Sequence, residues 1–326
     1  MLGASMIEQA AARPTAWRGR TAAWLQAYGV YAALGGLILF NLVATSNFLT
    51  VDNFRTQLLQ AAPVVIVALG MALVIGTEGI DLSVGAVMAL AAAMIPQYLG
   101  YGAAAAVLVA LLIGLAAGVF NGVLVARIGI QPIIATLALL VGGRGLALVI
   151  AHGQLVDVKN ASFLTLGSGD VFGIPISVLI AALLAVLTGL LIRRTTFGRR
   201  LVAIGGNRSA SELAGLPVRR VLVAVYAICG VFAALAGVLA TARLQASDPA
   251  DVGVLMELSA ITAVVVGGTP LTGGKVRVVG TVAGALLMQL VLATLIKHDL
   301  PSSTAQMVQA VIIVAAVYVA RGRNSR

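Results

Sequence analysis

The chain has 326 residues, of which 60% are hydrophobic and 10% are charged, and its formal net charge is +10. Soluble globular domains carry about 25% charged residues, so this composition excludes a soluble domain and indicates a multi-pass membrane protein. The basic residues gather at the ends of apolar runs, where orientation and anionic lipid account for them, so the charge does not indicate a nucleic-acid partner. The single cysteine excludes an internal disulfide, and the two distant histidines give no metal-ligand spacing.

Apolar runs of membrane-spanning length follow one another along the chain. A helix needs roughly 20 apolar residues to cross a bilayer. The first run follows a polar, basic segment, 1–24, and is longer than the roughly 7–15 residues of a secretory signal core, so we read it as an uncleaved span. Ten spans are predicted, at 25–44, 58–76, 82–97, 103–125, 131–150, 174–193, 219–242, 257–271, 278–297 and 304–320. The third and eighth are short and interrupted by glycine.

The distribution of charge orients these spans, because Lys and Arg near span ends are retained in the cytoplasm. With both termini inside, Arg127, the arginines between 193 and 220, Lys275 and Arg277 are cytoplasmic. Acids gather on the other side: Asp52, Asp157, Asp170, Asp248, Asp251, Glu257 and Asp299. The two outer loops, at 152–173 and 243–257, are either plain connectors or an acidic docking surface for an extracytoplasmic protein.

Few polar side chains fall at membrane depth. Arg144 is the one charge well inside a predicted span, and a buried cation must line a wet cavity, find a partner or extend to the surface. Asp81 precedes a helical run, and we prefer a helix-capping role for it, while Glu78 is left open. The candidate pathway residues, some of which could equally bond between helices, are Gly79, Asp81, Ser83, Asn121, Thr136 and Arg144.

Small residues recur at a spacing that lets helices pack closely in lipid. Gly114, Gly118 and Gly122 lie four apart, as do Gly280 and Gly284. The stretches 72–90 and 263–286 also echo each other, each with a glycine-rich break between two apolar runs. Transporters often contain repeats with broken segments near the pathway, although chance similarity of two such hairpins is an alternative.

One long polar break, 191–221, carries seven arginines against a single acid, Glu212. Its middle predicts a short helix, with Asn207 or Ser209 as N-cap and Gly215 as the stop before Pro217. A capped helix on the cytoplasmic face would give another protein a rigid surface on which to dock. The alternative is a long loop of the kind that any transporter can have.

The chain lacks a phosphate-binding loop. In the nearest candidate, GGTPLTGGKV at 267–276, the Lys comes one residue late and Val276 replaces the magnesium-binding hydroxyl. The cytoplasmic segments are too short for a nucleotide-hydrolysing domain. We therefore expect no cofactor on this chain, and any ATP and Mg to bind a partner.

Three stretches resemble the membrane subunits of bacterial ABC importers for monosaccharides, of the ribose, xylose and galactofuranose type. They are GMALVIGTEGIDLSVGAVMAL (70–90), TFGRRLVAIGGNRSASELAGLPV (196–218) and ELSAITAVVVGGTPLTGGKVRVVGTVAGALL (257–287). The second is similar to the cytoplasmic coupling segment of that family. The chain departs from the family pattern at Glu78, where a small residue is common, and at the pair Thr269-Pro270.

The resemblance implies an all-α polytopic helix bundle of about ten transmembrane helices, with a cytoplasmic coupling helix, in the bacterial inner membrane. The permease domain would occupy 25–320, with a coupling loop at 194–218 and a cytoplasmic tail at 321–326. The implied partners are an ABC ATP-binding subunit, a periplasmic sugar-binding protein and a second permease copy or paralogue. The residues that would enter a groove of the ATPase are Asn207, Arg208, Ser209, Ala210, Glu212, Leu213, Ala214, Gly215 and Leu216.

The leading interpretation is therefore a permease subunit that moves a pentose or hexose delivered by the binding protein. An ion-coupled secondary transporter is the alternative, and it would work without partners and depend on intramembrane acids. No acid within a span pairs with another acid or a histidine, which argues against a proton relay. A membrane-embedded enzyme is a third interpretation, but the sequence shows no catalytic pair of residues and no set of metal ligands.

Overall fold

The computed structural model describes residues 16–301 and, beyond them, 303–304, 307–308, 310–312 and 314. Its helices are α1 (Ala16–Ala44), α2 (Val51–Gly76), α3 (Val84–Tyr98), α4 (Ala103–Val123), α5 (Pro132–Ile150), α6 (Ala161–Ser168), α7 (Ile176–Arg194), α8 (Thr196–Gly206), α9 (Arg208–Leu213), α10 (Val218–Leu244), α11 (Met256–Val266) and α12 (Val278–Lys297). Short helical turns follow α3 (Leu99–Tyr101) and α4 (Leu124–Ile128). The strands are β1 (Val156–Asp157), β2 (Asp170–Val171), β3 (Ile174–Pro175) and β4 (Ala246–Ser247).

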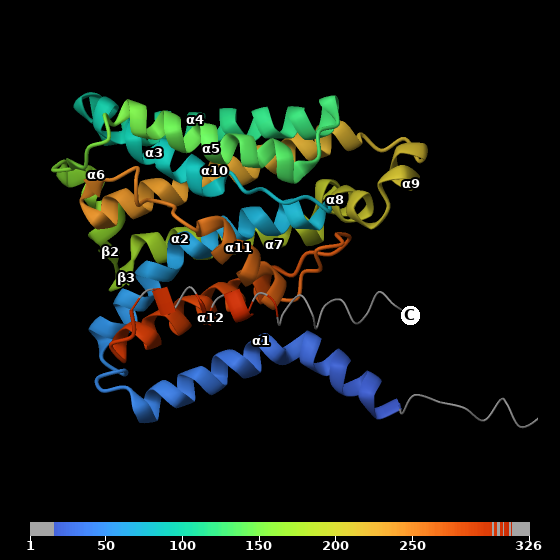
Figure 1. Cartoon of the computed structure of the whole chain (residues 1–326), viewed down its shortest axis with the longest axis horizontal. Coiled ribbons are helices and arrows are strands. Elements are labelled where there is room, and N and C mark those ends of the chain that lie inside the picture. Colours follow the sequence, from blue (N-terminus) through green and yellow to red (C-terminus); the bar gives the residue numbers. More distant parts are fainter. Residues whose placement is uncertain (1–15, 302, 305–306, 309, 313, 315–326) are drawn as a thin grey trace, which may run out of the picture.

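Within the described part of the chain, seven helices are long and apolar enough to cross a membrane. The prediction of an all-α, polytopic membrane bundle is therefore confirmed. Two further predicted spans correspond to shorter apolar helices, Tyr28–Ala44 and Met256–Val266, and the predicted tenth span, 304–320, lies largely outside the described residues. In Figure 1 the long helices run roughly side by side, with α8 and α9 at one end and α6 with the β2–β3 hairpin at the other.

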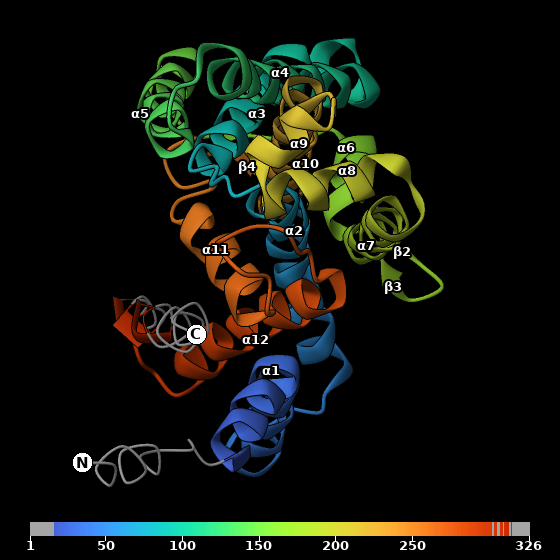
Figure 2. The same cartoon turned by 90° about the vertical axis from the view of Figure 1, so that its right-hand side faces the viewer.

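Helix α2 is the centre of the bundle. In the most apolar stretch of α2, 78% of the residues are buried, whereas the corresponding share is 17% in α7 and 22% in α5. Seen from the end, α2 lies between the group of α3, α4 and α10 and the group of α11 and α12 (Figure 2). Helix α7 lies at the edge of the bundle, where apolar side chains such as Leu183 and Val186 are exposed.

The glycine stripes pack helix against helix, as predicted. A Cβ added at Gly114 or Gly118 would strike the backbone of α10, one added at Gly284 would strike the backbone of α11, and one added at Gly280 would strike Gly267, the residue that caps the end of α11. Between these helices the glycines let backbones approach closely, which stabilises packing in a membrane where helices gain little from the hydrophobic effect.

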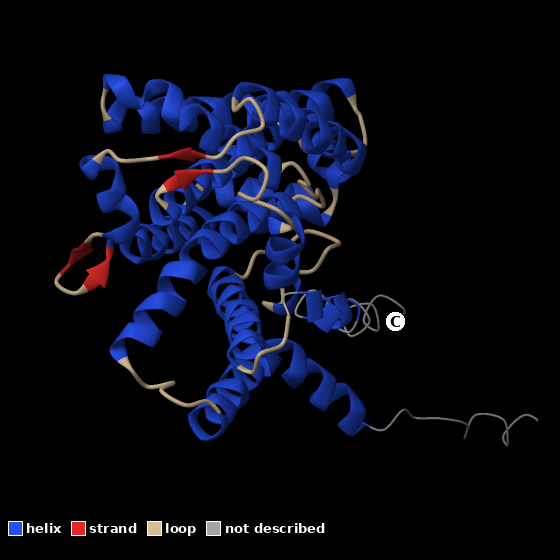
Figure 3. Cartoon of the chain, turned by 60° about the vertical axis from the view of Figure 1, so that its left-hand side comes forward, coloured by secondary structure: helices blue, strands red, loops and turns tan. Residues whose placement is uncertain are grey.

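The loops at 152–173 and 243–257, which the charge distribution predicts to lie outside, contain structure that the sequence did not predict. Helix α6 lies within 152–173, and strand β1 pairs with β4 from the loop after α10, with Val156 opposite Ser247. Strands β2 and β3 form a small hairpin that stands away from the helical core in Figure 3, whereas the β1–β4 pair lies against the helices, where the Ser247 hydroxyl donates to the Ala92 carbonyl at 2.7 Å. Strands of two residues are too short to leave a periodic pattern, which explains why they were missed.

Candidate functional site

Helix α9 is the short capped helix that the sequence predicts at the arginine loop. Asn207 is its N-cap, and the Asn207 Oδ1 accepts a hydrogen bond from the Ala210 amide at 2.9 Å. Gly215 follows with φ of 73°, a left-handed conformation that favours glycine. The choice between Asn207 and Ser209 as cap is thus settled in favour of Asn207.

Most of the residues predicted for coupling lie on the exposed surface of α9 and of the turn that follows it. Arg208 and Glu212 make an exposed ion pair at 3.3 Å, and the Leu213 side chain is 92% exposed. Leu216 is half-buried, at the edge of a hollow of about 610 Å³ at the base of α9. The predicted residues that are exposed are Asn207, Arg208, Ser209, Ala210, Glu212, Leu213, Ala214 and Gly215.

Helix α8, which the sequence analysis missed, joins α9 to the bundle. Thr195 caps it by accepting a hydrogen bond from the Gly198 amide at 3.1 Å. Leu201 and Ile204 are buried on one side, whereas Arg199 and Arg200 are exposed on the other. This apolar and basic alternation at helical spacing was readable in the sequence.

The end of α8 meets two other backbones at a contact that we call the glycine junction, made by Gly76, Gly205, Gly273 and Gly274. The Gly274 amide donates a hydrogen bond to the Gly76 carbonyl at 3.1 Å. A Cβ added at Gly205 would strike that same carbonyl and the Gly274 nitrogen. The three stretches that carry the family resemblance therefore converge here.

The two echoing stretches end their first helices in the same way. In α2 the Gly79 amide donates to the Val74 carbonyl at 3.1 Å, and in α11 the Thr269 amide donates to the Val264 carbonyl at 3.1 Å. The left-handed residue is Glu78 in the first (φ 65°) and Gly268 in the second (φ 86°). The repeat thus extends from sequence to backbone, with Glu78 where glycine is favoured.

A buried polar cluster occupies the break between α2 and α3. The Ser83 hydroxyl donates to Asp81 Oδ1 at 2.6 Å and accepts from the Asn121 amide nitrogen at 2.8 Å. The Thr136 hydroxyl accepts from the Leu82 amide at 3.0 Å. With Gly79, which packs against the Tyr226 hydroxyl, five of the six predicted pathway residues lie together.

The capping role preferred for Asp81 is wrong. Helix α3 begins at Val84 with Ser83 as N-cap and no side-chain cap. The Asp81 carboxylate instead accepts from the Ser83 amide at 3.0 Å, one position before the helix. Asp81 therefore fixes the turn that leads into α3, because short acidic side chains bond readily to backbone amides two residues on.

Two oxygens of this region remain unpaired within the described residues. They are the Asn121 Oδ1 and the Tyr226 hydroxyl, both fully buried. Buried polar atoms in proteins usually have a partner. A water or a hydroxyl-bearing solute could satisfy them. Tyr226 was not a candidate in the sequence analysis, because it lies mid-helix in an apolar run.

Arg144 lies apart from the cluster, at the loop between α10 and α11. Its Nη1 donates to the Pro249 carbonyl at 3.0 Å and to the Val252 carbonyl at 2.8 Å. Nearby, Glu257 is 8% exposed and its Oε2 has no partner among the described residues. Of the three alternatives predicted for this cation, the structure therefore shows that Arg144 has a partner, namely backbone carbonyls of the loop between α10 and α11.

Comparison with known proteins identifies the family. The model of the branched-chain amino acid transport system / permease component matches residues 53–317. The fructose import permease protein FruF of Bifidobacterium longum is 40% identical over 265 residues, which cover 79% of this chain and 74% of that protein. No solved structure matches the chain.

Two relatives from Escherichia coli K12 are equally similar. The galactofuranose transporter permease protein YtfT is 40% identical over 80% of this chain and 77% of its own length. The ribose import permease protein RbsC is 39% identical over 92% of this chain and 95% of its own length. The family model covers most of this chain, and the relatives align with it over most of their own length. The chain therefore belongs to this family and is a multi-pass membrane permease component of an ABC importer.

Proposed function

We propose that this chain is the gate of an ATP-driven importer that moves a monosaccharide across the bacterial inner membrane, with both termini in the cytoplasm. The relatives named for fructose, galactofuranose, ribose and D-allose support a sugar as the solute. A periplasmic sugar-binding protein delivers it to the outer loops, and a second permease copy or paralogue completes the pore. The relatives favour this reading over the alternative of an ion-coupled transporter, which would take up solute without partners.

The energy comes from a partner ATPase that binds ATP and Mg and holds α9 in a surface groove. The observation that carries this proposal is the exposure of Leu213, a large apolar side chain that is 92% exposed on a capped helix surrounded by arginines. Exposed apolar side chains with a polar rim are typical of binding sites for other proteins. The hollow beside Glu212 and Arg219 adjoins this surface.

Movement of α9 passes to the membrane through α8 and the glycine junction. Because Gly205 packs directly on the last carbonyl of α2, a shift of α8 displaces the start of the 77–83 break and the 267–277 loop together. The Asp81–Ser83–Asn121 cluster includes the last residues of this break. ATP on one side and the loaded binding protein on the other would then bias two states of the bundle.

The test is co-purification of the tagged ATPase subunit with the permease from membranes. Leu213→Asp should reduce the recovered ATPase at least tenfold, since a central apolar contact that becomes a buried charge costs more than about 1.4 kcal/mol. Ile128→Asp is the matched control, because Ile128 is 64% exposed at the same end of the bundle but lies on no coupling surface. Unchanged recovery with Leu213→Asp contradicts the proposal, and so does uptake by the chain without its ATPase.

A further inference from the structure

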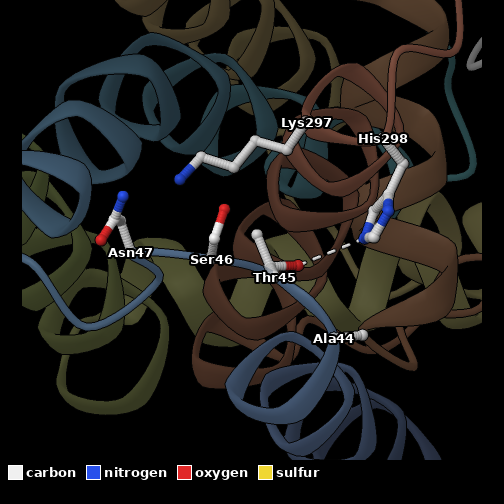
Figure 4. A pocket seen from close by; sticks show the side chains of 6 residues that line it. All are labelled: Ala44, Thr45, Ser46, Asn47, Lys297 and His298. Carbon is white, nitrogen blue, oxygen red and sulfur yellow. Dashed lines mark hydrogen bonds between the residues drawn. The ribbon is translucent and has the colours of Figure 1, made fainter.

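A polar pocket lies at the end of the bundle opposite α9, between the turn after α1 and the end of α12. Its volume is about 400 Å³, and it is lined by Ala44, Thr45, Ser46, Asn47, Lys297 and His298. Figure 4 shows the Lys297 side chain reaching over Ser46 toward Asn47, while Thr45 and His298 close the other side. Neither the buried polar cluster around Asp81 nor the glycine junction contributes a residue to this pocket.

The floor of the pocket is held in place by hydrogen bonds between α1 and α12. The Asn41 amide donates to the Thr294 hydroxyl at 2.8 Å, and the Thr45 hydroxyl donates to Asn41 Oδ1 at 2.8 Å. Thr45 also lies 3.3 Å from His298 Nε2. Asn41, Thr45 and Thr294 are buried, so these bonds fix the position of the pocket wall.

The lining chemistry suits an anion with several acceptor oxygens. Lys297 provides an ammonium group, Asn47 an amide, and Ser46 a hydroxyl, all of them donors. Among the described residues, no carboxylate lines the pocket and Lys297 has no ion-pair partner. The nearest acid in the sequence, Asp299, follows His298 but does not line the pocket. Phosphate oxygens match such a set of donors.

The surroundings indicate that the phosphate belongs to a lipid. Just below the pocket on α1, Leu39, Phe40 and Val43 are 64%, 52% and 91% exposed. Apolar side chains exposed on a helix at the edge of a membrane protein are expected to face acyl chains, and because α1 and α12 both end at the pocket, the pocket should lie where headgroups begin. We infer that this pocket binds the phosphate of a phospholipid in the outer leaflet, with its acyl chains along α1.

The experiment is native mass spectrometry of the full-length chain in detergent, titrated with dioleoyl phosphatidylglycerol. Wild type should retain the phospholipid but not dioleoylglycerol, which has the same acyl chains and no phosphate. Lys297→Met should weaken the apparent affinity about tenfold, as expected for one hydrogen bond to a charged group. Lys159→Met, which removes another exposed lysine on the same side, should leave the affinity unchanged.

A second variant keeps the backbone intact. Asn47 has φ of 57°, so Asn47→Gly removes the amide without adding strain and should also weaken binding severalfold. Equal affinities for both lysine variants, retention of dioleoylglycerol, or displacement of the lipid by millimolar inorganic phosphate would each overturn the inference. None of these outcomes depends on the transported solute or on the ATPase.

Discussion

The guanidinium of Arg144 holds the loop between α10 and α11 at three carbonyls, those of Pro249, Ala250 and Val252. Arg144→Ala would leave these acceptors without their donor, and the bonds to the Pro249 and Val252 carbonyls are partly buried. Hydrogen bonds to charged groups contribute about 1.5–3 kcal/mol each, so the loop should open. We expect uptake per permease molecule to fall about tenfold or more, while membrane abundance falls less than twofold.

The measurement is solute uptake by membranes that contain the whole importer, normalised to permease abundance from an immunoblot. Arg144→Lys is the informative companion, because a single ammonium cannot reproduce the fork of the guanidinium and should give an intermediate value. If uptake and abundance fall equally in Arg144→Ala, the residue serves folding alone.

At the residue scale the sequence found most of the polar cluster but not its roles. Asp81, Ser83, Asn121 and Thr136 were candidates because polar residues at membrane depth are rare. Tyr226 was hidden in an apolar helix, and the partner of Arg144 lies more than a hundred positions along the chain. Contacts over such sequence separations depend on helix packing, which a single sequence does not encode in a readable pattern.

Helix α8 is the element through which we expect coupling to pass, and Gly205 is its point of contact. Gly205→Ala places a methyl group against the Gly76 carbonyl and the Gly274 nitrogen, both of them backbone atoms that cannot rotate away. Overpacking of this kind costs about 1–3 kcal/mol and should push α8 off α2. We expect at least tenfold slower uptake with unchanged recovery of the ATPase, because α9 itself is intact.

Gly206→Ala is the control for this prediction. A Cβ added at Gly206 would have nothing within 4 Å, and the residue is exposed. Uptake and ATP hydrolysis should therefore match wild type. If Gly205→Ala also supports wild-type uptake, the glycine junction does not carry the movement.

At the element scale the long helices were predictable and the short ones were not. Spans such as 103–125 and 278–297 lie close to α4 and α12, because twenty apolar residues leave an unmistakable pattern. Helix α9 was found from its caps, Asn207 and Gly215. Helix α6 and the strand pairs β1–β4 and β2–β3 were missed because they are short and their sequences show no clear periodicity.

The arrangement of the whole molecule gives the two ends different chemistry. Arginines of 193–220 gather at the end with α8 and α9, whereas the acids Asp157, Asp170, Asp248 and Asp251 belong to the opposite end (Figure 1). Lys and Arg near span ends stay on the cytoplasmic side during insertion. This asymmetry predicts that α9 faces the cytoplasm and that the β2–β3 hairpin faces the periplasm.

Cysteine labelling of intact cells tests this orientation. Phe172, at the tip of the β2–β3 hairpin, is 101% exposed, and Ser209 is exposed on α9. A membrane-impermeant maleimide should label Phe172→Cys in intact cells and Ser209→Cys only after the membrane is opened. The native Cys229 is fully buried and should stay unlabelled in both states, which provides the internal control. Labelling of Ser209→Cys from outside would place α9 beyond the reach of any cytoplasmic ATPase, and the coupling role of the glycine junction would fall with it.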